Sequence, residues 1–353
     1  MNCKFDLDLY LKPFNSYEMM YYETALPIKG EEIQLLYPVD RIIAVTNYGL
    51  DKTYKEGEDY IVRNNKLIIT ENSQIKQLSL DEYYLKEPAT IQINVNKKRC
   101  RYHFADERYL MFGELDFMSS KQIAVTYTHP IMNVLYTQKE QKEKLNRFFS
   151  KLESRNNPTI VFYGDSITEG CNSSGTKYGG NVKPYALSWP EMVFEFLKKK
   201  YNTEINYVNT AKGGMTTKWG LDNYSERVNK YHPDLFVLAF GMNDGPLSKE
   251  EHIKQIKEII HGVRKDCPDS DIVLISPCVP NIESNWYDGN QKTYYEEYEK
   301  LDIDNVAVVN MTKAHLSLLE RKAYKDMSGN NINHPNDFLA RVYAQAVLKV
   351  MGL

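Results

Sequence analysis

The chain has 353 residues, 42% of them hydrophobic and 26% charged, which is long enough for two hydrophobic cores and favours two domains. Its 47 acidic and 44 basic residues give a net charge of −3 without a long basic run, which argues against a nucleic-acid partner. No apolar run approaches the roughly 18–20 residues that cross a bilayer, so we expect no membrane partner.

The first residues, MNCKFDLDLYLKPF, carry acids where a secretory signal would have its apolar core, so a cytoplasmic location is expected. The five cysteines are odd in number and widely scattered. They have neither the spacing of a metal site nor that of a disulfide framework, and we expect no metal ligands among them.

Residues 1–137 carry the pattern of a β domain. Short runs rich in β-branched and aromatic residues predict strands at 33–37, 42–45, 59–62, 66–70, 90–95 and 123–127. Asn64 and Asn65 suit a hairpin turn, because asparagine tolerates a positive φ. Several short strands without long helical patterns predict an all-β sandwich, similar to a jelly roll.

A change of period at residues 138–152 marks the expected domain junction. Four apolar residues there recur at helical spacing among Lys, Glu and Gln, namely Leu145, Phe148, Phe149 and Leu152. The sequence therefore predicts an amphipathic linking helix over 138–152, at the start of a second domain over 138–353.

The second domain alternates between strand-like and helical patterns. Strands are predicted at 159–163, 205–209, 235–240, 272–276 and 305–309, with helices between them and a last helix near 336–350. Such alternation is typical of βαβ units, so we expect a parallel sheet with helices on both faces, a three-layer α/β/α fold.

Ser166 directly follows the first of these strands. The buried run 160–163 stops at Gly164-Asp165-Ser166, which presents a hydroxyl at the carboxyl end of a strand, where open α/β sheets hold their reactive groups. A serine there needs a base to take its proton and donors to stabilise the oxyanion.

Two later strand ends offer candidate donors. The second strand is followed by Gly213-Gly214, whose backbone can approach a ligand closely; taken alone, the pair is better explained as an ordinary tight turn. The third strand is followed by Asn243, whose side-chain amide can reach the same oxyanion or can simply cap a turn.

The candidate base is His334, in a polar loop just before the last helix, which can return to the active edge of the sheet. Taken alone, it would be a surface residue. The other six histidines lie in helices, at a helix exit or in the β half: His103, His129, His232, His252, His261 and His315.

Together the blocks Gly-Asp-Ser-Ile, Gly-Gly, Gly-Met-Asn-Asp and His-Pro resemble, in this order, the GDSL or SGNH hydrolase superfamily over roughly residues 158–353. The resemblance implies a flavodoxin-like fold and Ser166 as nucleophile, with its own N–H in the oxyanion hole. It implies that Gly214 gives a backbone N–H, Asn243 a side-chain N–H, and that His334 is the general base.

One position departs from the family. An aspartate usually stands three residues before the histidine, and here that residue is Asn331. Three explanations stay open: a dyad in which a backbone carbonyl or Asn331 orients His334, a substitute acid such as Asp326 or Asp337, or a weakened site. We favour the dyad, because similar family members with an added β-sandwich lack the acid.

The order of the two domains resembles two-domain carbohydrate esterases, which implies removal of acetyl groups from sugars through an acyl-enzyme on Ser166 and without a cofactor. The polar, glycine-rich loop 171–181, with Tyr178, and Trp286 are the expected sugar contacts, although Trp286 can equally be a packing residue. The alternatives are an acyltransferase that uses the same site and a carbohydrate-binding protein with a weakened site.

Overall fold

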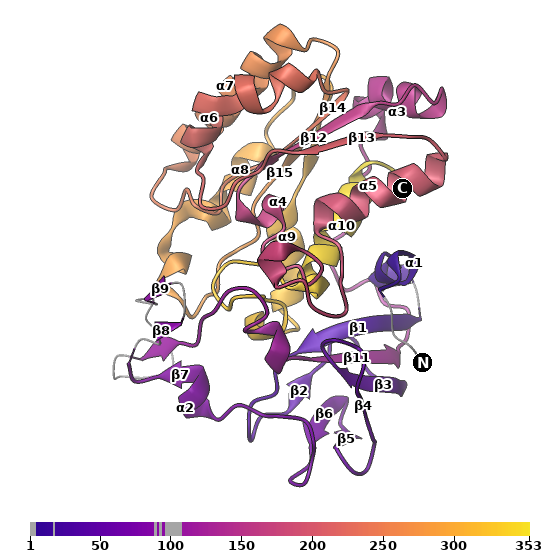
Figure 1. Ribbon diagram of the computed structural model, residues 1–353, viewed down its shortest axis with the longest axis vertical. Coiled ribbons are helices and arrows are strands. Elements are labelled where there is room, and N and C mark those ends of the chain that lie inside the picture. Colours follow the sequence, from indigo (N-terminus) through magenta and orange to yellow (C-terminus); the bar gives the residue numbers. More distant parts are fainter. Residues whose placement is uncertain (1–4, 17, 88–89, 92–93, 96–107) are drawn as a thin grey trace.

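The computed structural model describes residues 5–16, 18–87, 90–91, 94–95 and 108–353. In Figure 1 the described residues up to 137, here called the β region, lie below residues 138–353, here called the α/β region. Among the described helices, none combines the length and the apolar character that crossing a membrane requires.

The paired strands within each sheet of the β region are antiparallel. The larger sheet has the order β1 (Met19–Ala25), β11 (Ile123–Thr128), β3 (Arg41–Asn47), β4 (Thr53–Tyr54). A second has the order β2 (Ile33–Gln34), β6 (Lys66–Ile69), β5 (Tyr60–Arg63), and two further pairs are β7 (Tyr84–Leu85) with β10 (Tyr109–Leu110) and β8 (Thr90–Ile91) with β9 (Asn94–Val95). The described part of the region also contains two short α-helices, α1 (Leu7–Tyr10) and α2 (Leu80–Tyr83).

Most of the predicted strands are present here, but one predicted run is divided, and β1, β4, β7 and β10 were not predicted. The run 90–95 is not one strand but two short strands that pair with each other, and the residues between them lie outside the described part of the chain. The strand β1 was not predicted, because its Met-Met-Tyr-Tyr-Glu-Thr-Ala sequence has no clean alternation and buries Glu23 completely. The hairpin turn is confirmed, with φ of 51° at Asn64 and 61° at Asn65.

The α/β region contains the predicted five-stranded parallel sheet. Its order is β13 (Asn206–Asn209), β12 (Thr159–Gly164), β14 (Leu235–Ala239), β15 (Asp271–Ile275), β16 (Val306–Val309). Numbered within this sheet, the order is 2-1-3-4-5, the doubly wound arrangement of flavodoxin-like folds. The predicted fold class is confirmed.

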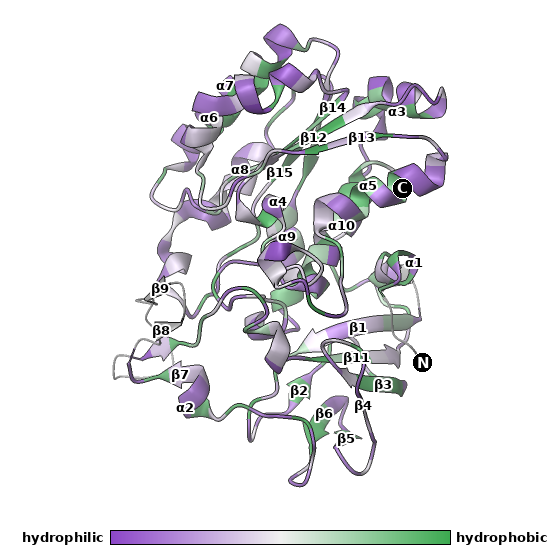
Figure 2. Ribbon diagram, viewed as in Figure 1, coloured by the Kyte–Doolittle hydropathy of each residue, from purple (hydrophilic) through white to green (hydrophobic). Residues whose placement is uncertain are grey.

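Helices cover both faces of this sheet (Figure 1). They are α3 (Asn146–Glu153), α4 (Ser166–Glu169), α5 (Trp189–Tyr201), α6 (Thr217–Arg227), α7 (Lys249–Asp266), α8 (Tyr294–Tyr298), α9 (Met311–Leu319) and α10 (Asp337–Val350). Successive strand residues point to opposite faces, so Val161 packs on the side of α7 and Phe162 on the side of α5. Figure 2 accordingly shows hydrophobic residues in the central strands and hydrophilic ones along the outer sides of α6 and α7.

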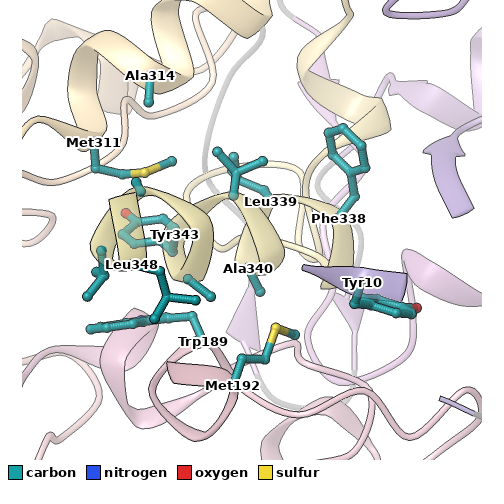
Figure 3. Packing of buried hydrophobic residues seen from close by; sticks show 14 of the residues in the cluster. Tyr10, Trp189, Met192, Met311, Ala314, Phe338, Leu339, Ala340, Tyr343 and Leu348 are labelled. Carbon is teal, nitrogen blue, oxygen red and sulfur yellow. The ribbon is translucent and has the colours of Figure 1, made fainter. Parts of the chain in front are cut away.

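The last helix, α10, is buried between neighbours on several sides. Figure 3 shows Trp189 of α5 on one side of Tyr343 and Met311 of α9 on the other, with Tyr10 of the β region nearby. Phe14, also from the β region, stacks on Phe338 with ring centroids 5.4 Å apart. The hydrophobic core is therefore continuous between the two regions.

The linking helix is shorter than predicted. A 3-10 turn over Lys142–Leu145 leads into α3, and the predicted apolar face is buried. Before it, the side chain of Gln141 donates to and accepts from the backbone of Val308 in β16, and that of Gln138 does the same at Asn310, directly after β16. Residues 138–141 are thus bound beside the sheet and form no helix.

A buried polar contact joins the β region to the segment that precedes α10. Lys322 Nζ donates to Glu23 Oε1 of β1 at 2.8 Å, and both side chains are fully buried. Beside them, the N–H of Leu26 donates to Asp326 Oδ1 at 2.7 Å, and Gln122 Nε2 donates to the carbonyl of Ser328 at 3.0 Å. The β region thus holds the segment that leads to His334.

Candidate active site

Ser166 lies at the carboxyl end of the central strand β12, where α4 begins. Asp165 caps α4, because its Oδ1 accepts the N–H of Ile167 at 3.0 Å. A Cβ on Gly164 would lie 2.4 Å from the carbonyl oxygen of Ala239 in β14, so only glycine fits there. The strand can therefore approach its neighbour closely and turn at once into the serine.

His334 contacts this serine directly. Its Nε2 lies 2.9 Å from Ser166 Oγ, and both side chains are buried with a small exposed fraction. The loop that carries it is organised by Asn330, whose Oδ1 accepts the N–H groups of Ile332, Asn333 and His334 at 3.0 Å each. The predicted pair of serine and histidine is thus brought together by the fold.

The other ring nitrogen, Nδ1 of His334, faces two acceptors. Asn172 Oδ1 lies 2.8 Å away and Glu114 Oε2 lies 3.1 Å away. The amide of Asn172 is oriented by its Nδ2, which donates to the carbonyls of Leu115 and Gly329. Because a carboxylate and an amide oxygen only accept, Nδ1 must carry the proton of the neutral ring, and the lone pair of Nε2 faces Ser166.

The expectation that Asn331 orients His334 is corrected. Asn331 Nδ2 donates to the carbonyl of Met111 at 2.9 Å, and its Oδ1 accepts the hydroxyl of Tyr83 at 3.1 Å. Both groups belong to the β region, so Asn331 binds the segment that leads to Glu114 instead of the imidazole.

The two substitute acids considered from the sequence also have other partners. Asp326 accepts the N–H of Leu26, and Asp337 accepts the N–H of Ser174 at 2.8 Å. Neither forms a hydrogen bond to His334 among the contacts of the described residues.

The glycine pair lies beside the serine. A Cβ on Gly213 would be 3.7 Å from Ser166 Cβ, and the N–H of Gly213 donates to Glu169 Oε2 at 2.7 Å. Gly214 has a φ of 76°, and within the described part of the chain neither its N–H nor that of Ser166 donates to a protein acceptor. Both donors therefore remain available to an oxyanion, although their role stays a prediction.

Asn243 is tied to both neighbouring loops. Its Nδ2 donates to the carbonyl of Met215 at 3.0 Å, next to Gly214, and the preceding N–H, of Met242, donates to Asp165 Oδ2 at 3.3 Å. One amide hydrogen is thus used to position the side chain, and the second is left for a ligand.

The predicted sugar contacts are less defined. The carbonyl of Tyr178 accepts the N–H of Asn172 at 3.2 Å, which places loop 171–181 against the site, and Lys177 Nζ lies 4.6 Å from the Tyr178 ring centroid. Trp286 is partly buried against the apolar cluster that contains Ile332. Substrate binding by Tyr178 and Trp286 stays a prediction.

Burial shifts several ionisable groups in this part of the molecule. It raises the pKa of Asp165 to about 7, against the opposing effect of its two backbone donors. Burial lowers the pKa of His252 and of His315 to about 3, so both are neutral near pH 7. His252 Nε2 lies 2.8 Å from the hydroxyl of Tyr298 in the core, which makes it a structural histidine.

Two residues at the site were not found from the sequence. Asn172 lies in the polar loop after Ser166, but nothing in that loop distinguishes it from its neighbours. Glu114 stands 220 residues before His334, in a Gly-Glu-Leu-Asp run without periodicity. Only the packing of the β region brings it to the imidazole.

The geometry agrees with the comparison to protein families. The model of the GDSL-like lipase/acylhydrolase family matches residues 162–341, more than half of the chain, so the chain belongs to this family. The predicted resemblance and the predicted enzyme class, a serine hydrolase of ester bonds, are confirmed. No protein with a curated description matches the chain.

Several solved structures are similar to the chain. A two-domain esterase (CEX) active on acetylated mannans, co-crystallised with mannopentaose, has a TM-score of 0.50 at 19% identity. The match covers 61% of this chain and 54% of that one, so the chain spans about half of its length. A variant of Axe2, an acetyl xylan esterase from Geobacillus stearothermophilus, has a TM-score of 0.43 at 20% identity over 55% of this chain and 94% of that one.

Proposed function

We propose that the protein is a serine esterase that removes small acyl groups, acetyl first among them, from O-acetylated carbohydrate. The observation that carries the proposal is the 2.9 Å contact between Ser166 Oγ and His334 Nε2, with only acceptors facing Nδ1. A histidine held in this tautomer is a general base aimed at the serine proton.

The reaction follows from these positions. His334 Nε2 takes the proton of Ser166 as Oγ attacks the ester carbonyl, and the oxyanion accepts the N–H groups of Ser166 and Gly214 and the amide of Asn243. The imidazolium then gives its proton to the leaving alcohol, which leaves an acyl-enzyme. A water molecule, activated by the same histidine, releases the acid and restores Ser166.

The choice of substrate is supported by the surroundings of the serine. Loop 171–181 next to it is polar and rich in glycine, which suits a hydrated ligand better than an acyl chain of a lipid. The matched two-domain structure is active on acetylated mannans, which supports the same class of substrate for this chain.

Replacement of the nucleophile tests the function. We expect Ser166→Ala to lose at least about 10³-fold in kcat on 4-nitrophenyl acetate and on acetylated manno- and xylo-oligosaccharides, because no acyl-enzyme forms. Ser225→Ala, at an exposed position of α6, is the control and should keep wild-type kcat. Unchanged turnover by Ser166→Ala would remove Ser166 from the mechanism.

The same assay separates hydrolysis from acyl transfer, which share the first half of the reaction. Acetate is the expected product with or without added sugar or thiol. Acylated acceptor at the expense of acetate would instead make the protein a transferase. Sugar binding without turnover would identify a binding protein with a weakened site. The two acceptors at His334 Nδ1 argue against this alternative.

A further inference from the structure

We propose that Glu114 is a positioning residue of the catalytic site, an inference that rests on the proposed function. The β region would thereby supply the carboxylate that is missing at Asn331. Glu114 Oε2 lies 3.1 Å from His334 Nδ1, on the ring edge opposite Ser166. Serine, imidazole and carboxylate thus stand in one line, although the carboxylate comes from another part of the fold.

The carboxylate is held in place by a residue of the histidine loop. Asn330 Nδ2 donates to Glu114 Oε1 at 3.1 Å, which leaves Oε2 toward the imidazole. The same Asn330 accepts the N–H of His334, so one side chain fixes both the acid and the histidine.

The segment around Glu114 is bound at several points. Asn331 donates to the carbonyl of Met111 and Asn172 donates to the carbonyl of Leu115, on either side of Glu114. Asn330, Asn331 and Asn172 of the α/β region therefore all donate hydrogen bonds to residues 111–115 of the β region. Such a concentration of hydrogen bonds is what a catalytic group needs to stay within a fraction of an ångström of its working position.

The two acceptors at Nδ1 have separate tasks. Asn172 Oδ1, at 2.8 Å, suffices to fix the tautomer, but an amide carries no charge. Glu114 carries the negative charge that stabilises the imidazolium formed when His334 takes the serine proton. Among the described residues, the carboxyl groups near this pair include Asp165, which caps α4, and Glu169, which accepts the N–H of Gly213.

The charge of Glu114 can be removed while an acceptor is kept. In a serine protease triad the loss of the aspartate charge costs about 10⁴-fold through the wrong tautomer. Here Asn172 preserves the tautomer, so we expect Glu114→Gln to lower kcat about 10- to 100-fold and to leave KM within about twofold. The acid limb of the kcat/KM profile should move to lower pH, because the imidazolium loses its counter-charge.

The experiment uses the full chain with 4-nitrophenyl acetate from pH 5 to 9, and the rate at which a fluorophosphonate labels Ser166 as a substrate-independent readout. Asp116→Asn, two residues along the same segment, is the matched control and should keep wild-type kcat and acid limb. Melting temperatures of all variants establish that they are folded. If Glu114→Gln is unfolded, Glu114→Ala replaces it, because alanine places no amide against Asn330.

The outcomes separate this inference from the proposed function. Wild-type kcat and acid limb in a folded variant without the carboxylate would overturn the role of Glu114 while Ser166→Ala is still inactive. Turnover that survives in Ser166→Ala, or a wild type that neither turns over ester nor labels, would overturn the proposed function itself. A lower kcat, an unchanged KM and a displaced acid limb would support the role of Glu114.

Discussion

At the scale of single residues, the carboxyl group of Asp337 in the first turn of α10 is the feature with the clearest effect on stability. It is buried, and it accepts the N–H of Ser174. Burial raises its pKa to about 6, against the opposing effect of its hydrogen bonds with Ser174 and Tyr48. The raised pKa means that the folded protein is more stable with this carboxyl group protonated than with it ionised.

The sign of the pH dependence follows from this shift. The folded protein keeps the proton of Asp337 up to about pH 6, whereas the unfolded chain loses it near the ordinary aspartate pKa of 3.8. The contribution of the Asp337 proton to the free energy of unfolding is therefore fully present below about pH 4. It is lost as the pH rises through about 6, and it amounts to about 3 kcal/mol in total. We expect Asp337→Asn to lose this part of the pH dependence, because asparagine keeps an acceptor for Ser174.

Urea unfolding at pH 4.5 and pH 8 measures the effect. The free energy of unfolding of Asp337→Asn should fall less between the two pH values than that of the wild type. Asp269→Asn, an exposed aspartate, is the control and should behave like the wild type. An equal fall in Asp337→Asn and the wild type would contradict the raised pKa.

At the scale of secondary-structure elements, the junction of β12 and α4 depends on Gly164. A Cβ there would lie 2.4 Å from the carbonyl of Ala239 and 2.5 Å from Thr168 Oγ1. Because a backbone carbonyl of the central sheet cannot move away, we expect Gly164→Ala to cost about 1–3 kcal/mol of stability. Its kcat should fall at least about tenfold, since Ser166 is displaced two residues later.

The measurement is urea unfolding together with ester turnover. Gly57→Ala serves for comparison, because that glycine has a φ of 82° but no atom within 4 Å of an added Cβ. It should lose some stability through its backbone conformation and keep the wild-type kcat. Wild-type stability and turnover in Gly164→Ala would show that the junction accommodates the methyl group.

How much of the fold could be predicted depended on the length of its elements. The strands of the parallel sheet were predictable because runs such as 159–164 are apolar almost throughout and helices separate them. In the β region, strands such as Thr53–Tyr54 have two residues, too few to show a period. The residues that stabilise these short strands are distant in the sequence, so no local pattern predicts the strands.

At the scale of the whole molecule, the buried ion pair of Glu23 and Lys322 connects the two regions. Replacing Lys322 by methionine leaves the carboxylate of Glu23 buried without its cation, and we expect a loss of about 3–5 kcal/mol in the free energy of unfolding. The double variant Glu23→Gln/Lys322→Met should recover most of this loss, because residue 23 then carries no charge and Asp326, 3.9 Å from Lys322, keeps Lys325 at 3.7 Å.

Urea unfolding of the two variants checks this expectation. Lys313→Met, which breaks an exposed pair with Glu299, is the control and should cost less than about 1 kcal/mol. A double variant as unstable as Lys322→Met alone would show that packing, and not the unpaired charge, explains the loss.

Only those residues of the candidate site that lie in loops at the carboxyl edge of the parallel sheet could be predicted from the sequence. Ser166 and His334 were found because each stands in a polar loop at the active edge of the parallel sheet, in a recognisable order. The partners of Nδ1 were missed for a physical reason. Glu114 belongs to a different region, and its approach to His334 is decided by the contact between the regions.

The extended segment before α3 has a consequence for solubility. Parallel sheets end in edge strands whose unpaired N–H and C=O groups can recruit a strand of another molecule, and β16 is an apolar Val-Ala-Val-Val strand. The side chain of Gln141 binds the backbone N–H and C=O of Val308 in this strand, and that of Gln138 binds those of Asn310, the residue after it. Two glutamine amides therefore shield this edge from strand addition and from the aggregation that follows it.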